Sequence, residues 1–287
     1  MNIENWRSKI FTDLSEEEFN KLAIEAFRYQ SSENAIYKQF IELNNVDIDN
    51  ILNYTDIPFI PIELFKNHIV SCFNSLPSHY FESSGTTSSN KSRHYFNTYE
   101  IYEDSFNSGF RHFFGNIEDY VLLALLPNYM EQKNSSLIYM IDYLIKRTDN
   151  KLSDFYLSDF EKLNFVLNEA LKSGKRVILF GVTYALLDFS EYKKNKYPEL
   201  IIFETGGMKG RRKELTRSEL HGILKASFGV SQIYGEYGMA ELFSQAYSFK
   251  DGIFRCPPWM KVLIREANDP KTILKANKTG GINVIDL

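Results

Sequence analysis

Residues 121–126 read Val-Leu-Leu-Ala-Leu-Leu and are followed at once by Pro127-Asn128. An unbroken apolar run of this length, stopped by a turn signal, is typical of a strand that is buried on both faces. Two further runs of the same kind lie at residues 176–180 and 200–203. Strands of this type belong to mainly parallel sheets covered by helices, so the sequence predicts an α/β fold.

Helical patterns precede and separate these strands. The first 55 residues are predicted to be helical, with Ser15 and Glu18 forming a capping box, and residues 56–287 to form the α/β core of one domain. Further helices are predicted at residues 62–67, 98–114, 136–146, 160–172, 184–187 and 216–228. Additional strands are predicted at residues 230–234, 260–265 and 282–287.

Composition limits the classes of function. The 287 residues include 23 Phe and 18 Tyr, which predicts an aromatic core and an aromatic ligand pocket. A net charge of −4 argues against a general nucleic-acid surface. The two cysteines, Cys72 and Cys256, form no CxxC pair, so we expect no disulfide scaffold and a reducing, cytoplasmic location. The sequence predicts neither a signal peptide nor a membrane span, and it leaves a homo-oligomer open.

A loop rich in hydroxyl groups follows Tyr80-Phe81. Residues 83–91 read Ser-Ser-Gly-Thr-Thr-Ser-Ser-Asn-Lys, which differs from the spacing of a Walker P-loop. Gly85 lets the backbone approach a ligand closely, while hydroxyl and N–H groups donate to phosphate and Lys91 offsets its charge. By itself such a loop is as well explained by a solvated connection.

Two more loops follow predicted strands. Residues 204–212 read Glu-Thr-Gly-Gly-Met-Lys-Gly-Arg-Arg, and their paired glycines let a flat group lie on the backbone. Residues 234–241 read Tyr-Gly-Glu-Tyr-Gly-Met-Ala-Glu, where Tyr237 can stack on a base and Glu241 can hold Mg²⁺. Ligands bind at the carboxyl ends of strands in parallel sheets, so the three loops predict one kind of site.

The order of these loops resembles the adenylate-forming superfamily of acyl-CoA synthetases, adenylation domains and luciferases. Its phosphate loop is similar to residues 83–91 and its later Y-G-x-T-E motif to residues 237–241. The narrower resemblance is to the acyl-protein synthetases of bacterial bioluminescence operons and to phenylacetate-CoA ligases. It is carried by residues 57–61, 81–87, 204–211, 237–242 and 244–247.

The resemblance implies ATP-dependent activation of a carboxylic acid, fatty or aryl, as an acyl-adenylate, followed by transfer to a thiol. Such an enzyme is an AMP-forming acid–thiol ligase that uses ATP and Mg²⁺, and its acceptor is coenzyme A, a carrier protein or a partner enzyme. The implied catalytic residues are Lys91, Glu241 and Thr86, with Glu241 as the metal ligand. The implied nucleotide-binding residues are Ser83, Ser84, Gly85, Thr86, Thr87, Lys91, Gly206, Gly207, Tyr237, Gly238 and Glu241. The acid is expected near Phe180, Gly181, Val182, Thr183 and Tyr184, although core packing explains any single one of these residues better.

The sequence also departs from the superfamily pattern. Ser88 and Asn90 stand where Gly and Pro are usual, and Ala240 stands in place of Thr or Ser. The superfamily's T-G-D-like motif and its small C-terminal domain are not seen before Leu287, which predicts a fragment or an enzyme with a reduced C-terminus. A catalytically reduced nucleotide-binding module that acts with a partner therefore remains an alternative. An acyl-CoA ligase-like enzyme and an unrelated α/β scaffold are the others.

Overall fold

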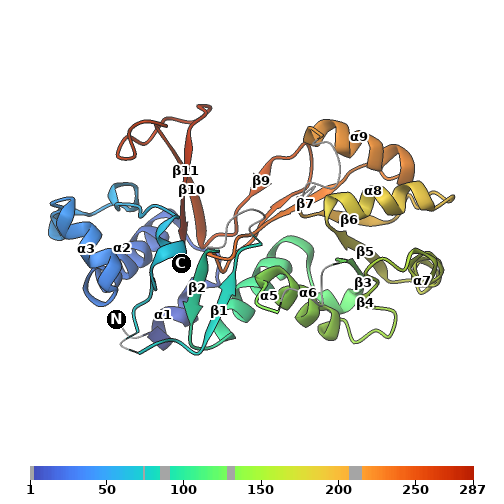
Figure 1. The fold of residues 1–287 in the computed structure, drawn as a ribbon, viewed down its shortest axis with the longest axis horizontal. Helices are drawn as coiled ribbons and strands as arrows, with labels where there is room; N and C mark the ends of the chain where they lie inside the picture. The colour runs from blue at the N-terminus through green and yellow to red at the C-terminus, as the bar shows by residue number, and fades with distance from the viewer. Residues whose placement is uncertain (1–2, 74, 85–90, 128–132, 207–214) are drawn as a thin grey trace. The chain divides into compact units, whose positions relative to one another are not determined.

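The computed structural model describes residues 3–73, 75–84, 91–127, 133–206 and 215–287. The chain divides into two compact units. Figure 1 shows the fold coloured by residue number from the N-terminus to the C-terminus. The first unit comprises Met1–Ser105, Met239–Ser244 and Cys256–Leu287. The second comprises Phe106–Gly238 and Gln245–Arg255.

The first unit begins with helices. They are α1 (Ile3–Ile10), α2 (Glu16–Glu33) and α3 (Ala35–Leu43), followed by the short helices η1 (Ile48–Asn50), η2 (Tyr54–Asp56) and α4 (Leu64–Asn67). The predicted capping box is present, because the Ser15 hydroxyl accepts from the Glu18 N–H and the Glu18 carboxylate accepts from the Ser15 N–H. Asn34 ends α2, and its side chain caps α3 by accepting from the Tyr37 N–H.

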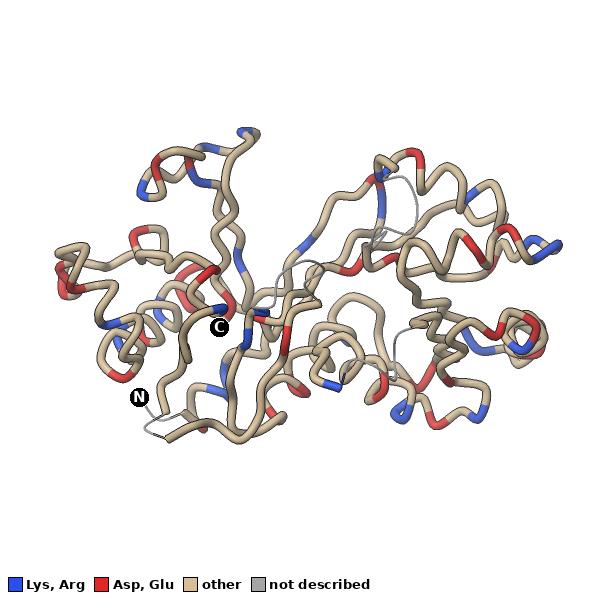
Figure 2. The backbone as a smooth tube through the Cα atoms, in the orientation of Figure 1, with Lys and Arg blue, Asp and Glu red and all other residues tan. Residues whose placement is uncertain are grey.

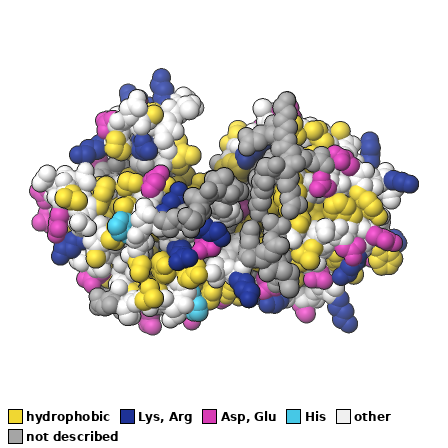
Figure 3. Space-filling model, in the orientation of Figure 1, with side chains coloured by type: hydrophobic (Ala, Val, Ile, Leu, Met, Phe, Trp, Pro, Cys, Tyr) yellow, Lys and Arg dark blue, Asp and Glu magenta, His cyan; other side chains and the backbone are white. Residues whose placement is uncertain are grey.

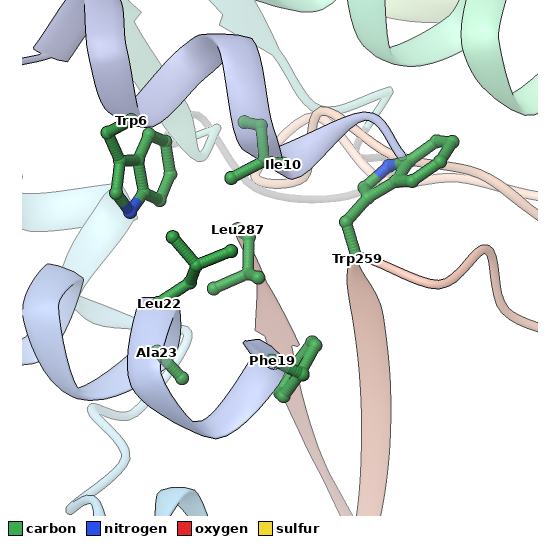
Figure 4. Packing of buried hydrophobic residues seen from close by; sticks show 7 residues of the cluster. All are labelled: Trp6, Ile10, Phe19, Leu22, Ala23, Trp259 and Leu287. Carbon is green, nitrogen blue, oxygen red and sulfur yellow. The ribbon is translucent and has the colours of Figure 1, made fainter. Parts of the chain in front are cut away.

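Two antiparallel hairpins complete the first unit. One pairs β1 (His79–Glu82) with β2 (Arg93–Phe96), and the other pairs β10 (Met260–Arg265) with β11 (Gly281–Asp286). Apolar side chains from α1, α2 and the chain beside the second hairpin form a buried cluster (Figure 4). Its members are Trp6, Ile10, Phe19, Leu22, Ala23, Trp259 and Leu287. Burying this apolar surface joins the N-terminal helices to the end of the chain.

The second unit is built on a sheet in the order β4-β3-β5-β6-β7-β8-β9. Its strands are β3 (Tyr120–Leu125), β4 (Asp154–Phe155), β5 (Arg176–Gly181), β6 (Ile201–Glu204), β7 (Tyr234–Tyr237), β8 (Ala246–Ser248) and β9 (Phe254–Arg255). Pairing is parallel from β4 through β7, and β8 and β9 add antiparallel strands. Every residue of β3 is buried, as the apolar run predicts.

Helices cover both faces of this sheet (Figure 1). They are α5 (Glu100–Phe114), which begins in the first unit, η3 (Ile117–Asp119), α6 (Ser136–Arg147), α7 (Phe160–Lys172), α8 (Thr183–Tyr192) and α9 (Arg217–Phe228). Helices α7, α8 and α9 lie along one face, while α6 and the end of α5 lie on the other. The step from β3 to β4 runs in one direction along the sheet, and the steps from β4 to β7 run in the other. Because crossovers between parallel strands are as a rule right-handed, this reversal is expected to put α6 on the opposite face from α7, α8 and α9.

The fold prediction is confirmed, with one strand misplaced. The α/β architecture, the large mainly parallel sheet and the helical N-terminal segment are all present. The strand predicted at residues 230–234 is instead β7, which runs from Tyr234 to Tyr237. Its sequence, Tyr-Gly-Glu-Tyr, contains no apolar run that would predict a strand. Gly235 is closely packed within the strand, because a Cβ there would lie 3.1 Å from Phe254 Cζ. Helix α8 is also longer than predicted, because its apolar residues continue to Phe189.

Charged residues of both signs are spread over the helices (Figure 2). Acidic and basic side chains both occur across the face drawn in Figure 3. Such mixing, with a net charge of −4, gives no support for a nucleic-acid surface. Among the described residues, we find no helix with the length and apolar character needed to cross a membrane.

Candidate functional site

The predicted site residues fall in both units. Ser83, Ser84, Lys91 and Glu241 belong to the first unit. The second unit holds Gly206, Tyr237, Gly238 and the predicted acid-binding stretch at residues 180–184. Gly85, Thr86, Thr87 and Gly207 lie outside the described residues.

Hydrogen bonds close the base of the hydroxyl-rich loop between β1 and β2. The Ser83 N–H donates to the Ser92 carbonyl at 3.0 Å, and the Ser92 N–H donates to the Ser83 hydroxyl at 3.1 Å. Lys91 Nζ lies 2.8 Å from one oxygen of Glu82, and Arg93 Nε lies 3.1 Å from the other. Burial acts to raise the pKa of Glu82, but the hydrogen bonds from the two cations lower it overall.

Glu241 lies in a turn of the first unit. The Leu242 N–H donates to the Met239 carbonyl at 3.2 Å, which places Glu241 third in a four-residue turn. The His94 ring meets the same turn, with Nδ1 3.2 Å from the Ala240 carbonyl oxygen. Burial lowers the pKa of His94 to about 4 against the effect of this bond, so the ring is neutral at pH 7. A carbonyl only accepts, so Nδ1 carries the proton.

At the carboxyl end of β6, Glu204 joins three elements of the second unit. Its Oε1 accepts from the Thr183 hydroxyl at 3.0 Å and from the Gly206 N–H at 2.7 Å. Its Oε2 lies 3.7 Å from His221 Nε2 on α9. Burial acts to raise the pKa of Glu204, but the nearby His221 ring and the hydrogen bond from Thr183 lower it overall. The Gly206 φ of +74° lies in the left-handed region that favours glycine, and the Glu204 carboxylate holds this turn through the Gly206 N–H.

The next strand, β7, carries a second buried carboxyl group. Burial, reinforced by the charge of Glu204, raises the pKa of Glu236 to about 8. A Cβ added to Gly238 would lie 2.7 Å from Glu236 Oε1, so the carboxyl group packs directly against that glycine. Tyr237 lies within the strand rather than in the predicted loop, and its ring meets Phe254 edge-on at 6.0 Å. The two strand ends therefore combine glycine backbone with buried carboxyl groups.

The stretch predicted to bind the acid is buried. Residues 180–184 all lie in the core, and a Cβ on Gly181 would come within 2.9 Å of Leu186 and 3.3 Å of the Leu125 carbonyl oxygen. Phe180 lines an apolar cavity of about 10 Å³ between the sheet and helices α5 and α6. That volume is close to one water molecule, so as it stands the cavity holds no acyl chain. The role of this stretch in binding an acid stays a prediction.

Sequence reasoning missed the polar residues, buried or half-buried, that support these turns. Glu204, Glu236, His94 and Asp286 were not predicted as site residues. Each is a titratable residue with apolar or aromatic neighbours in a short strand. This pattern is the sequence signal by which they could have been found. Their burial depends on which strands pair, and a single sequence does not show that.

Comparison with known families decides the classification. A family model described as acyl-protein synthetase, LuxE, matches residues 8–286. The chain belongs to this family. The predicted resemblance to acyl-protein synthetases is therefore confirmed, and it covers nearly the whole sequence. No curated protein sequence matches the chain.

A solved structure shares the fold. It is 2-hydroxyisobutyryl-CoA ligase in an open conformation, in complex with 2-HIB-AMP and CoA. The match has a TM-score of 0.58 and 10% sequence identity, and it covers 96% of this chain and 62% of the ligase chain. The chain thus spans about three fifths of that ligase. At this identity the likeness shows the fold alone.

Proposed function

We propose that this protein is an AMP-forming acid–thiol ligase that activates a fatty or aryl acid with ATP. The observation that carries the proposal is the match of residues 8–286 to the acyl-protein synthetase family. In the first step a carboxylate oxygen attacks the α-phosphorus of ATP, and the bond to pyrophosphate breaks. In the second step a thiol sulfur attacks the acyl carbon and displaces AMP.

The first step brings two anions together, so the protein must neutralise phosphate charge and align the reactants. We assign phosphate binding to Ser83, Ser84 and Lys91, together with Gly85, Thr86 and Thr87. The closed base of the β1–β2 hairpin supports this role, because it presents Lys91 on an anchored loop. The acid needs no general base, since it is already a carboxylate at neutral pH.

We assign the adenine to Gly206, Gly207, Tyr237 and Gly238, and the acid to residues 180–184. Gly206 and Gly238 support the first assignment because they follow the carboxyl ends of two adjacent parallel strands, β6 and β7. The Thr183 hydroxyl shares Glu204 with the Gly206 N–H, so the two predicted subsites have one anchor in the second unit.

The residues present fit a magnesium ion held largely by its substrate. Among the described residues, no cluster of three or more His, Cys, Asp or Glu side chains is placed to hold a metal. Mg²⁺ in nucleotide sites commonly takes one or two carboxylates and completes its shell with phosphate oxygens and water. Glu241, half-buried in its turn, supplies such a carboxylate. The ion, when bound, would offset phosphate charge.

The acyl acceptor in this proposal is a thiol of coenzyme A, of a carrier protein or of a partner enzyme. Cys72 and Cys256 are both free thiols, and burial raises the pKa of each. A protonated thiol is a poor nucleophile, so neither is assigned as acceptor. Free cysteines are usual in a reducing compartment, which supports a cytoplasmic location.

Exchange of labelled pyrophosphate into ATP, over a panel of fatty and aryl acids, tests the activation step. We expect acid-dependent exchange that falls about 100-fold or more in Lys91→Ala and in Glu241→Gln. Arg93→Ala is the matched control, because it removes the other cation of Glu82 and should keep the exchange. Binding of ATP without exchange would instead support a nucleotide-binding module that acts with a partner.

A further inference from the structure

The short segment at residues 239–244 is anchored on both sides of Glu241. Before Glu241, the Ala240 carbonyl oxygen is bonded by the His94 ring, which also stacks on Phe243 at 4.6 Å between centroids. After Glu241, Asp286 Oδ2 accepts from the Phe243 N–H at 2.8 Å and from the Ser244 N–H at 2.9 Å. All of these residues belong to the first unit.

A third anchor holds the end of the segment. The Ser244 hydroxyl is buried, 2.9 Å from the Ser105 hydroxyl and 3.0 Å from Trp259 Nε1. An indole N–H only donates, so Ser244 accepts from Trp259 and keeps its own proton for another partner. The Leu287 N–H donates to the Trp259 carbonyl at 3.1 Å, which fixes the end of β11 beside the same tryptophan.

The two carboxylate oxygens of Asp286 are hydrogen-bonded unequally. Both backbone donors reach a single oxygen, Oδ2, while Oδ1 is enclosed without a hydrogen-bond partner. Enclosing a carboxylate oxygen without a hydrogen-bond partner costs free energy. The two hydrogen bonds from the Phe243 and Ser244 N–H groups must offset this cost. Those bonds restrain the backbone two and three residues after Glu241.

We propose that Asp286 and His94 are positioning residues that fix the turn at residues 239–242 and thereby aim the Glu241 carboxylate at its magnesium ion. The inference rests on the proposed function for the metal role of Glu241. His94 adds a consequence for phosphate binding: it lies on β2, the strand that leads out of the hydroxyl-rich loop. The hairpin that carries Lys91 and the turn that carries Glu241 are therefore bonded to one another within the first unit.

Hydrogen–deuterium exchange on the full-length protein tests the anchoring directly. Asp286→Ala should remove the protection of the Phe243 and Ser244 amides, whereas Asp286→Asn retains an oxygen acceptor and should keep most of it. Asn34→Ala is the matched control, because it removes a buried side-chain acceptor at α3 and lies far from this segment in the sequence. Equal protection in Asp286→Ala and in wild type would overturn the proposal.

The magnesium dependence of pyrophosphate exchange tests the positioning role. Asp286→Ala should raise the magnesium concentration needed for half-maximal exchange about 10- to 100-fold. The effect should be partly restored in Asp286→Asn and absent in Asn34→Ala. In a Glu241→Gln background, Asp286→Ala should add little, because both changes act through one carboxylate. Full additivity, or a magnesium dependence equal to that of wild type, would contradict the role.

The two proposals fail in different ways. Wild-type protein without exchange at any magnesium concentration would overturn the proposed function and with it the metal role of Glu241. Protection of the two amides then decides whether Asp286 anchors the segment. Wild-type exchange that Asp286→Ala leaves untouched would overturn only the positioning role.

Discussion

Glu236 is the residue whose ionisation most directly links pH to stability. Its folded-state pKa is about 8 against an ordinary value of 4.5, because burial and the charge of Glu204 disfavour the carboxylate. Between those two pH values the folded protein holds a proton that the unfolded chain releases. Stability from this group is therefore complete below pH 4.5 and is lost as pH rises toward 8.

Urea unfolding from pH 5 to 9 measures this effect. In wild type, we expect this group to lower the unfolding free energy by up to about 1.4 kcal/mol for each pH unit between 5 and 8. The Glu236→Gln variant should lack this pH-dependent loss. The titratable groups that face this region are Glu204 on β6, whose charge repels a Glu236 carboxylate, and Tyr247 on the paired strand β8, which stays neutral because burial raises its pKa. Glu219→Gln, an exposed change on α9, is the control and should leave the pH profile of wild type. Identical slopes in wild type and Glu236→Gln would contradict the buried carboxyl group.

At the same scale, the candidate site was only partly visible in the sequence. Lys91 and Glu241 stand out because each lies in a run that matches a known motif. Asp286 lies at the end of an Ile-Asn-Val-Ile-Asp-Leu run that predicts a strand and nothing more. Its function as an acceptor for residues 243 and 244 arises only when β11 pairs with β10 beside Trp259. Contacts of this kind join residues more than forty positions apart, and local pattern does not encode them.

Helix α9 is an element whose ends are fixed by local chemistry. Thr216 and Glu219 form a capping box at its start, and Gly229, at φ +76°, ends it in the left-handed conformation. Thr216→Ala should lower the unfolding free energy by about 1 kcal/mol, because it leaves the Glu219 N–H without its acceptor. Ser218→Ala, two residues further along the exposed surface, is the control and should be neutral or slightly stabilising. A Thr216→Ala protein as stable as Ser218→Ala would refute the capping role.

Elements with such local signals were the ones predicted well. The Ser15–Glu18 capping box located the start of α2, and the apolar patterns identified α7, α9 and β3 to within a residue or two. Strand β7 was missed because Tyr-Gly-Glu-Tyr has no apolar pattern, and its strand character comes from the neighbours β6 and β8. Pairing with those neighbours, rather than propensity, decides that element.

For the whole molecule, the proposed function predicts stabilisation by its nucleotide. A ligand at 100 times its dissociation constant adds about 2.7 kcal/mol to the unfolding free energy. For a chain of this size, that corresponds to a rise in Tm on the order of 5 °C, measured by thermal unfolding with ATP and Mg²⁺. Lys91→Ala should lose most of the shift and Arg93→Ala should keep it. A wild-type Tm that does not change with ATP would argue against nucleotide binding altogether.

The central sheet of the second unit has a further consequence, which concerns solubility at high concentration. Both outer strands, β4 and β9, are only two residues long. Asp154 on β4 forms an ion pair with Lys162, and Arg255 places a charge on β9. Short, charged outer strands offer few free backbone groups to a strand of another molecule. The same shortness that ends the sheet on each side thus guards a largely apolar, parallel core against edge-to-edge aggregation.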